Sequence, residues 1–202
     1  MSTETVTRRE QLLATAAELF AKRGFHGVSV ADLGAACGIS GPALYKHFAS
    51  KDAILAEMLV SISEELLAVG RERVGLAGGA DDAIRALVDW HVEFALTRRA
   101  LIVVQDRDWE SLPADAREQV RDLQRAYVDV WAGQLRRVHR GLRADRARAM
   151  AHVAFGLINS TPHSGLLPDL QMRALLTTMA LGALGLADHP SVIDSLPVGA
   201  HT

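Results

Sequence analysis

The sequence has little of what marks a secreted or membrane-spanning protein. Cys37 is its single cysteine, so an intramolecular disulfide is excluded. The longest run without Asp, Glu, Lys, Arg or His, Ala174 to Ala187, is shorter than the roughly 18 apolar residues that a membrane span requires. The N-terminal MSTETVTRRE also lacks the apolar segment of a signal peptide. We therefore expect a soluble, cytoplasmic protein that does not contact a membrane.

Aromatic residues and strand signals are scarce as well. Only 5% of the 202 residues are aromatic, and no alternating Val, Thr and Tyr segment is bounded by hairpin turns. The chain is nevertheless 49% hydrophobic, which is enough to bury a substantial core. These features predict an all-α protein.

Charge is unevenly distributed along the chain. The net charge is −2, yet residues 1–51 hold six Lys and Arg against four Asp and Glu, which leaves a net −4 for residues 52–202. The distribution of charge indicates nucleic-acid binding better than the total does. The asymmetry fits a small DNA-binding segment on a larger domain with another role.

Residues 27–51, GVSVADLGAACGISGPALYKHFASK, form the most informative stretch. Ser29 and Asp32 are spaced like a capping box, and Val30, Leu33 and Cys37 follow at helical spacing. This pattern predicts a helix of about two turns. On its apolar face, Cys37 is expected to behave as a small hydrophobic residue.

A second, very short helix is predicted directly after the first. Gly38 suits a left-handed turn, and Ser40 is the next N-cap, with Pro42 in the first turn. Leu44 and Phe48 lie four residues apart and can pack inward together. Two short helices joined by a tight glycine turn are typical of a helix-turn-helix motif, whose second helix enters the DNA major groove.

The same residues resemble the DNA-binding domain of TetR-family transcriptional regulators. The run GPALYKHFASK, preceded by GFHGVSVADLGAACGIS and an amphipathic helix, carries the resemblance over roughly residues 8–55. It implies a three-helix DNA-binding head at residues 1–50 and a larger helical body for ligand binding and dimerisation at residues 51–202. It also implies a ligand-responsive repressor that binds a palindromic operator as a dimer.

On this resemblance, the second helix and its flanks supply the DNA contacts. Tyr45, His47 and Lys51 match positions that typically meet the DNA backbone, while Lys46 can reach a guanine edge. Upstream, Arg8 and Arg9 either touch phosphates or belong to a solvated polar arm. The predicted DNA-binding residues are Ser29, Ala31, Gly41, Pro42, Ala43, Tyr45, Lys46, His47 and Lys51.

Helical patterns cover most of the remaining chain. Thr7 and Glu10 form a capping box for a first helix that ends at Gly24, and Ser50 caps a helix leading from the head into the body. Apolar spacing predicts helices at about 8–23, 51–73, 98–109, 113–139, 144–161 and 169–186, and another that starts at Asp81 or Asp82 and includes Ala95.

Polar groups inside these apolar faces indicate a small-molecule pocket. Tyr127, Trp131 and Gln134 place polar groups on one helix stripe, unless their tips simply reach solvent. His91 is either a hydrogen-bonded core residue or part of the pocket wall. A small, lipophilic effector fits the candidate residues, which are Trp90, His91, Phe94, Arg98, Arg107, Trp109, Tyr127, Trp131, His152, Phe155 and Asn159.

Arginines near these residues leave a second effector class open. The segment LIVVQDRDWESLPADAREQVRDLQRAYVDVW faintly resembles the body of TetR-family repressors of fatty-acid or sterol breakdown, whose effectors are acyl-CoA thioesters. Arg98, Arg99 and Arg107 either hold the phosphates of such a ligand or are solvated surface charges.

Residues 145–186 are the predicted dimer interface. The first helix there is apolar on two sides, and the last one has Arg173 as its only charge after Asp169. Such surfaces need a protein partner, and two-fold pairing into a four-helix interface would cover them. We therefore expect a homodimer.

Other function classes have weaker support. Eight histidines would allow an all-α enzyme or metal-binding bundle, but there is no HExxH or Glu-x-x-His motif, and no nucleophile beside an evident base. A constitutive architectural DNA-binding protein would not need so large a body. We expect no enzymatic activity, no metal and no cofactor.

Overall fold

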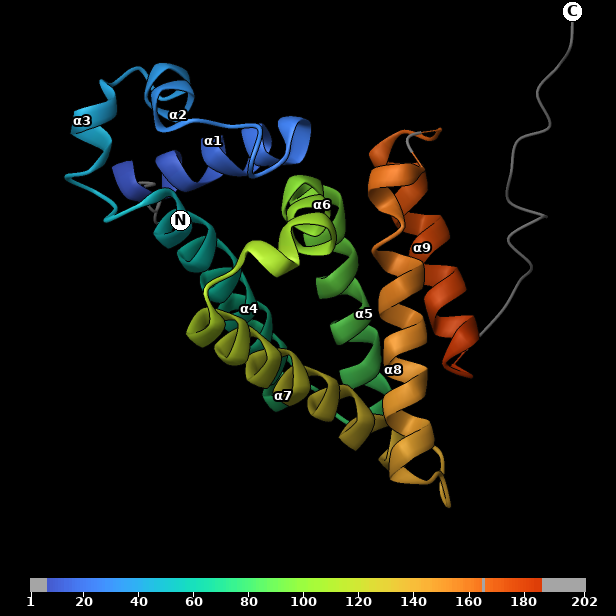
Figure 1. Cartoon of the computed structure of the whole chain (residues 1–202). Coiled ribbons are helices and arrows are strands. Elements are labelled where there is room, and N and C mark those ends of the chain that lie inside the picture. The colour runs from blue at the N-terminus through green and yellow to red at the C-terminus, as the bar shows by residue number, and fades with distance from the viewer. Residues whose placement is uncertain (1–6, 165, 187–202) are drawn as a thin grey trace, which may run out of the picture. The chain divides into compact units, whose positions relative to one another are not determined.

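The computed structural model describes residues 7–164 and 166–186. Over these residues the chain forms nine α-helices, two short 3-10 helices and no strand, which confirms the all-α prediction (Figure 1). The elements are α1 (Arg8–Arg23), α2 (Val30–Ala36), α3 (Gly41–Leu44), α4 (Lys51–Leu76), α5 (Ala80–Thr97), α6 (Arg99–Asp108), η1 (Trp109–Ser111), α7 (Ala114–Val138), α8 (Ala144–Ile158), η2 (Thr161–His163) and α9 (Asp169–Ala183). The predicted segments 1–50, 51–202 and 145–186 each include some residues outside the described ranges.

Local sequence signals set the helix ends. The Thr7 hydroxyl accepts a hydrogen bond from the Glu10 amide at 3.2 Å, while the Glu10 carboxylate accepts one from the Thr7 amide at 2.6 Å. This confirms the first capping box. α4 continues to Leu76, past the predicted end near residue 73, because a glycine such as Gly75 costs an exposed helix only about 1 kcal/mol.

The chain divides into two compact units. The described residues of Met1–Ala68 and Arg98–Tyr127 form one, and those of Val69–Thr97 and Val128–Thr202 form the other. In the first unit, α1 packs on α6, and Val104, Leu112 and Val120 join Phe20 and Leu33 in one buried cluster. Residues beyond position 98 therefore complete the hydrophobic core around the helix-turn-helix segment.

The second unit has its own helical core. α5 packs on α8 and α9, and α8 also packs on α9 (Figure 1). Small residues such as Ala151 and Ala154 on α8, both 0% exposed, permit this close packing. Its fully buried large side chains are Ile84, Leu87, Trp131, Leu135, Ile158 and Leu184.

Candidate nucleic-acid interface and effector site

A tight turn joins α2 to α3 as the sequence predicts. Gly38 has a φ of +67°, the left-handed conformation that glycine adopts without strain. The Ser40 hydroxyl then accepts a hydrogen bond from the Ala43 amide at 3.3 Å and caps α3. The Ile39 amide donates to the Gly34 carbonyl at 2.9 Å, which closes the turn back onto α2.

The segment 41–48 presents one polar face to solvent and buries the other. Leu44 and Phe48 are each 3% exposed, which confirms their predicted inward packing. Tyr45 is 55% exposed, and Lys46 is exposed beside it. Among the other predicted contacts, Pro42 and Ala31 are exposed, whereas Gly41, Ala43 and His47 are half-buried. Phenol and ammonium groups are side-chain groups that hydrogen-bond to phosphates and base edges in protein–DNA complexes.

Ser29 has a structural role in addition to its predicted DNA contact. Its hydroxyl accepts from the Asp32 amide at 3.1 Å, and it also bonds to the Asp32 carboxylate. Hydrogen bonds from the Ser29 side chain and backbone, together with Arg23, lower the pKa of Asp32 to about 2. Asp32 therefore stays ionised at neutral pH, and the second capping box is confirmed.

Lys51 is held by the protein itself. Its Nζ donates to the carbonyls of Phe25 and Val28, at 2.9 Å each, and lies 4.3 Å from the centroid of the Phe25 ring. Two of its three N–H groups are thus engaged, which leaves one for a phosphate. The sequence pattern did not indicate this role, because Phe25 lies 26 residues away.

Arg8 and Arg9 also contact the protein instead of forming a purely solvated arm. Arg9 bonds to the Glu57 carboxylate and to the His47 carbonyl, and its guanidinium carbon lies 4.4 Å from the Phe48 ring centroid. The hydrogen bonds that Arg9 donates to the Glu57 carboxylate raise the pKa of Arg9. Arg8 donates to the Cys37 carbonyl at 2.7 Å. The two arginines therefore tie the start of α1 to α4, to the turn after α2 and to the residues after α3.

In the second unit, several predicted effector residues meet in an aromatic cluster. The His91 ring stacks on Phe155 with centroids 4.6 Å apart, and the Trp131 ring meets Phe155 edge-on at 5.0 Å. His91 Nε2 lies 3.2 Å from Asn159 Oδ1, and Phe94 packs against the His91 ring at 5.7 Å. We call these five residues the His91 cluster.

Burial controls the charge of the His91 cluster. His91 is 3% exposed and Trp131 is 0% exposed. Burial lowers the pKa of His91 from 6.5 to about 4, against a smaller opposing effect of the Asn159 hydrogen bond. The imidazole is therefore neutral at pH 7, and the cluster offers apolar rings with a few neutral polar groups.

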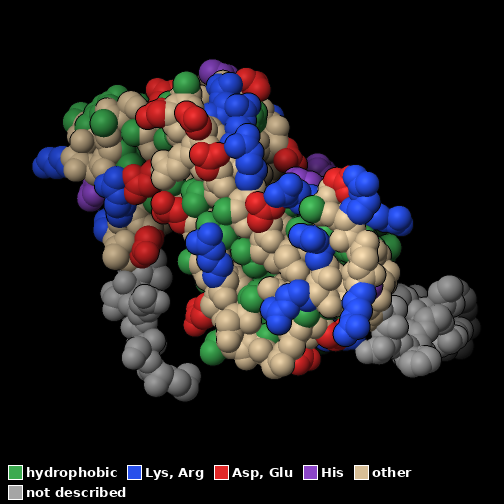
Figure 2. All heavy atoms as spheres, turned by 90° about the horizontal axis from the view of Figure 1, so that it is seen from below, with side chains coloured by type: hydrophobic (Ala, Val, Ile, Leu, Met, Phe, Trp, Pro, Cys, Tyr) green, Lys and Arg blue, Asp and Glu red, His purple; other side chains and the backbone are tan. Residues whose placement is uncertain are grey.

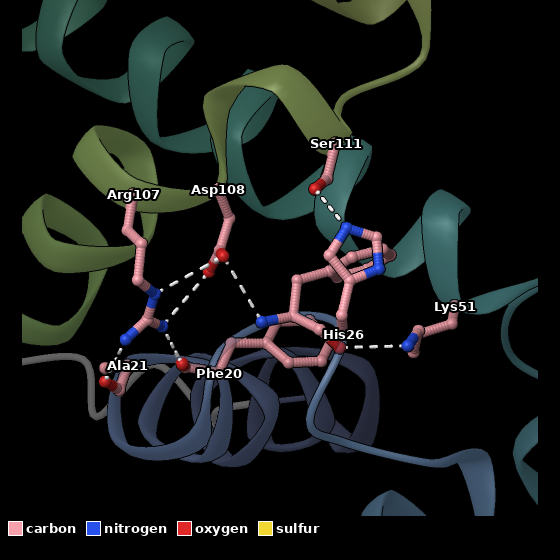
Figure 3. A network of polar contacts seen from close by, with 8 residues as sticks. Phe20, Ala21, His26, Lys51, Arg107, Asp108 and Ser111 are labelled. Carbon is pink, nitrogen blue, oxygen red and sulfur yellow. Dashed lines mark hydrogen bonds and ion pairs between the residues drawn. The ribbon is translucent and has the colours of Figure 1, made fainter.

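Six predicted effector residues are not members of the His91 cluster. In the second unit, His152 is exposed, and its ring meets the Phe155 ring edge-on at 6.3 Å. Trp90 is half-buried, with the Arg73 guanidinium 5.6 Å from its ring. The first unit contains the other four, which are Arg98, Arg107, Trp109 and Tyr127. Of these, Arg98 is exposed, Tyr127 is 4% exposed and Trp109 contacts Arg121 at 5.5 Å. Arg107 donates to the carbonyls of Phe20 and Ala21 (Figure 3).

Apolar side chains on α8 and α9 remain exposed in the single chain. Val153 is 62% exposed, Leu170 80% and Met179 47%. All three lie within the predicted dimer segment. Exposed apolar residues gathered on adjacent helices mark a surface that another protein can cover.

The described residues include neither a metal-binding group nor a membrane-spanning helix. The described residues contain no group of three or more His, Cys, Asp or Glu that could hold a metal ion. Within the same part of the chain, no helix is long and apolar enough to cross a membrane. On the face drawn in Figure 2, basic and acidic side chains are interspersed.

Two family models match the chain. The model for bacterial regulatory proteins of the tetR family matches residues 12–58, and the model for the tetracyclin repressor-like C-terminal domain matches residues 77–163. Together they cover more than half of the sequence. The first contains the helix-turn-helix segment, and the second contains every residue of the His91 cluster.

Individual relatives agree with these matches. The chain is 31% identical to the HTH-type transcriptional repressor KstR2 of Rhodococcus jostii (strain RHA1) over 131 residues, 63% of each protein, so less than two thirds of that relative's length is spanned. The fold of the present chain is similar to that of the ketosteroid transcriptional regulator KstR2 of Mycobacterium tuberculosis, with a TM-score of 0.74 and 23% identity. The match covers 90% of this chain and 96% of that regulator. The fold is also similar to that of FadR of Bacillus subtilis in complex with stearoyl-CoA, with a TM-score of 0.69, 17% identity and coverage of 87% and 95%. The chain belongs to the TetR family of bacterial transcriptional regulators.

Proposed function

We propose that the protein is a transcriptional repressor that binds a palindromic operator as a homodimer and is released by a small lipophilic effector. The observation that carries the proposal is the capped α2–turn–α3 segment, which is directly followed by the exposed side chains of Tyr45 and Lys46. The N-terminal half of a recognition helix contacts base edges when it enters a major groove. The proposed location is the cytoplasm, where bacterial DNA is found.

The proposed DNA contacts divide into two kinds. Tyr45, His47 and the remaining N–H of Lys51 would position the protein on phosphates, while Lys46 would reach a base edge. Gly41, Pro42 and Ala43 have no long polar side chain, so they would allow close approach to the bases. Ser29 and Ala31, at the start of α2, complete the proposed set.

The proposed effector is lipophilic because the His91 cluster is mostly apolar and its imidazole is neutral. FadR of Bacillus subtilis was solved with stearoyl-CoA, so acyl-CoA thioesters are one class to test. An effector releases the operator only if it binds the DNA-free conformation more tightly than the DNA-bound one. No catalytic role is proposed for the chain.

The proposed dimer would form through residues 145–186. The exposed side chains of Val153, Leu170 and Met179 supply apolar surface on α8 and α9. An obligate interface of this kind buries on the order of 2,000 Å² or more. Two-fold symmetry would then match the two half-sites of a palindromic operator.

The test begins by selecting an operator from random DNA duplexes with the full-length protein. The selected DNA is then titrated with acyl-CoAs of several chain lengths and, separately, with an uncharged sterol. DNA release and the intrinsic fluorescence of Trp90, Trp109 and Trp131 are recorded. We expect a selected palindrome and release by one lipophilic class. Recovery of no preferred duplex would contradict the DNA-binding proposal, whereas release by the sterol alone would reject the thioester class.

A further inference from the structure

The turn between α1 and α2 fixes where the helix-turn-helix segment begins. This turn consists of residues 24–28, and Ser29, the N-cap of α2, follows it directly. Gly24 has a φ of +80°, and its amide donates to the Phe20 carbonyl at 2.8 Å. Any rotation of this turn would change the direction in which α2, and therefore α3, leaves α1.

Two side chains from distant segments hold the peptide groups of Phe25 from opposite sides. Asp108, the last residue of α6, accepts a hydrogen bond from the Phe25 amide at 3.3 Å. Lys51, the first residue of α4, donates to the Phe25 carbonyl at 2.9 Å. Figure 3 shows Asp108 and Lys51 on the two sides of this turn. Phe25 is itself 3% exposed and packs edge-on against Phe20 at 5.3 Å.

The Asp108 carboxylate is buried but not isolated. Its side chain is 7% exposed, and Arg107 lies 3.1 Å from its Oδ2 atom. The same Arg107 guanidinium donates to the carbonyls of Phe20 and Ala21 in the last turn of α1. A cation at a helix C-terminus is favourable because the last carbonyls have no partner within the helix. The end of α6 therefore contacts both the end of α1 and the turn after it.

We propose that Asp108 is a positioning residue for operator binding, although it lies outside the helix-turn-helix sequence. Together with Lys51 it fixes the Phe25 peptide groups, and thereby the orientation in which α2 and α3 meet DNA. The inference rests on the proposed function. It gives a role in DNA binding to a residue of α6 that lies 83 positions from Phe25 in the sequence. In this role Asp108 does not itself contact the DNA.

The test compares Asp108→Ala with Asp108→Asn in the full-length protein. Alanine leaves the buried Phe25 amide without its acceptor, whereas the asparagine oxygen can still accept that hydrogen bond. We expect Asp108→Ala to weaken operator binding at least about tenfold, as the loss of a hydrogen bond to a charged group would. Asp108→Asn should recover most of the affinity. Asp106→Ala, an exposed carboxylate on the same helix, is the control and should bind like the unmodified protein.

Two further readouts separate positioning from unfolding and from direct DNA contact. The slope of log binding constant against log salt concentration should be unchanged in Asp108→Ala, because the bound state makes the same phosphate contacts. Loss of one phosphate contact would reduce that slope by about 1. Hydrogen exchange should speed up at the Phe25 amide while the amides of Ala16 and Ala17 in α1 stay protected. Unchanged affinity in Asp108→Ala, failure of Asp108→Asn to recover it, or loss of protection throughout α1 would overturn the inference. If the unmodified protein selects no DNA, the proposed function itself fails.

Discussion

Gly34 in α2 lies directly against the backbone of Gly41 in α3. A Cβ atom built on Gly34 would be 2.9 Å from the Gly41 nitrogen and 2.9 Å from the Ile39 carbonyl oxygen. These neighbours are backbone atoms, so they can move only if the turn between the helices moves. The close packing of the two helices therefore depends on the missing side chain at position 34.

We predict that Gly34→Ala destabilises the protein by about 1–3 kcal/mol, the usual cost of overpacking, and weakens operator binding. Gly133→Ala is the matched control, because Gly133 is exposed in α7 and its Cβ would meet nothing within 4 Å. That variant should gain roughly 0.5–1 kcal/mol from the higher helix propensity of alanine. Urea denaturation measures both, and equal stability of the two variants would contradict the packing argument.

Lys46 and Lys22 allow a second prediction, concerning the DNA interface. Both lysines are exposed, but only Lys46 lies in the proposed DNA contacts. Lys46→Ala should weaken operator binding. If Lys46 contacts a base, the substitution should cost about 1–3 kcal/mol of binding free energy and relax the sequence preference at one operator position. Lys22→Ala removes the same charge from the end of α1 and should leave specificity unchanged. Binding measured against all single-base operator variants would reveal the difference, and identical profiles would remove Lys46 from the base-reading set.

The lowered pKa of the buried His91 should make the stability of the protein depend on pH. The pKa of His91 is about 4 in the folded protein against 6.5 for the free group, so below pH 6.5 the unfolded chain binds a proton that the folded chain does not. The free energy of unfolding should therefore fall by about 3 kcal/mol in total as the pH drops from about 6.5 to about 4. Below about pH 4, protonation of His91 should lower the stability no further. His91→Gln should flatten this part of the pH profile, while His152→Gln, at an exposed position, should not. A profile unchanged by His91→Gln would show that the buried imidazole does not control it.

The exposed apolar residues of α8 and α9 predict the effect of one added charge. Val153→Glu should convert the proposed homodimer to monomers at micromolar concentration, because an unpaired carboxylate would be buried in the interface. Ala114→Glu adds the same charge in the first turn of α7, where a carboxylate is favourable, and should leave the dimer intact. Light scattering gives the mass of each variant. A monomer before any substitution, or a dimer after Val153→Glu, would place the interface elsewhere.

Local signals made much of the DNA-binding segment predictable. The pairs Thr7 with Glu10 and Ser29 with Asp32 are three residues apart, so the chain brings them together whenever a helix starts there. The left-handed Gly38 and the inward-facing Leu44 follow from conformational preference and helical spacing in the same way. These interactions need no information about the rest of the fold.

The sequence also indicated that the candidate effector residues are largely apolar with a few polar groups, but not which of them meet. His91, Trp131 and Phe155 come from three different helices, and their contacts depend on how those helices pack. The neutral state of His91 likewise follows from complete burial, which a single histidine on an apolar helix face does not establish.

The sequence by itself thus determined the helices, their caps and the helix-turn-helix motif, because those depend on residues a few positions apart. Only the tertiary structure decided that Lys51 and Asp108 meet at Phe25, and that Arg9 reaches Glu57 across 48 positions. Lysine and arginine have long side chains that can bind DNA, solvent or a backbone carbonyl equally well. Which partner they take depends on what the folded chain brings within about 3 Å of their nitrogen atoms.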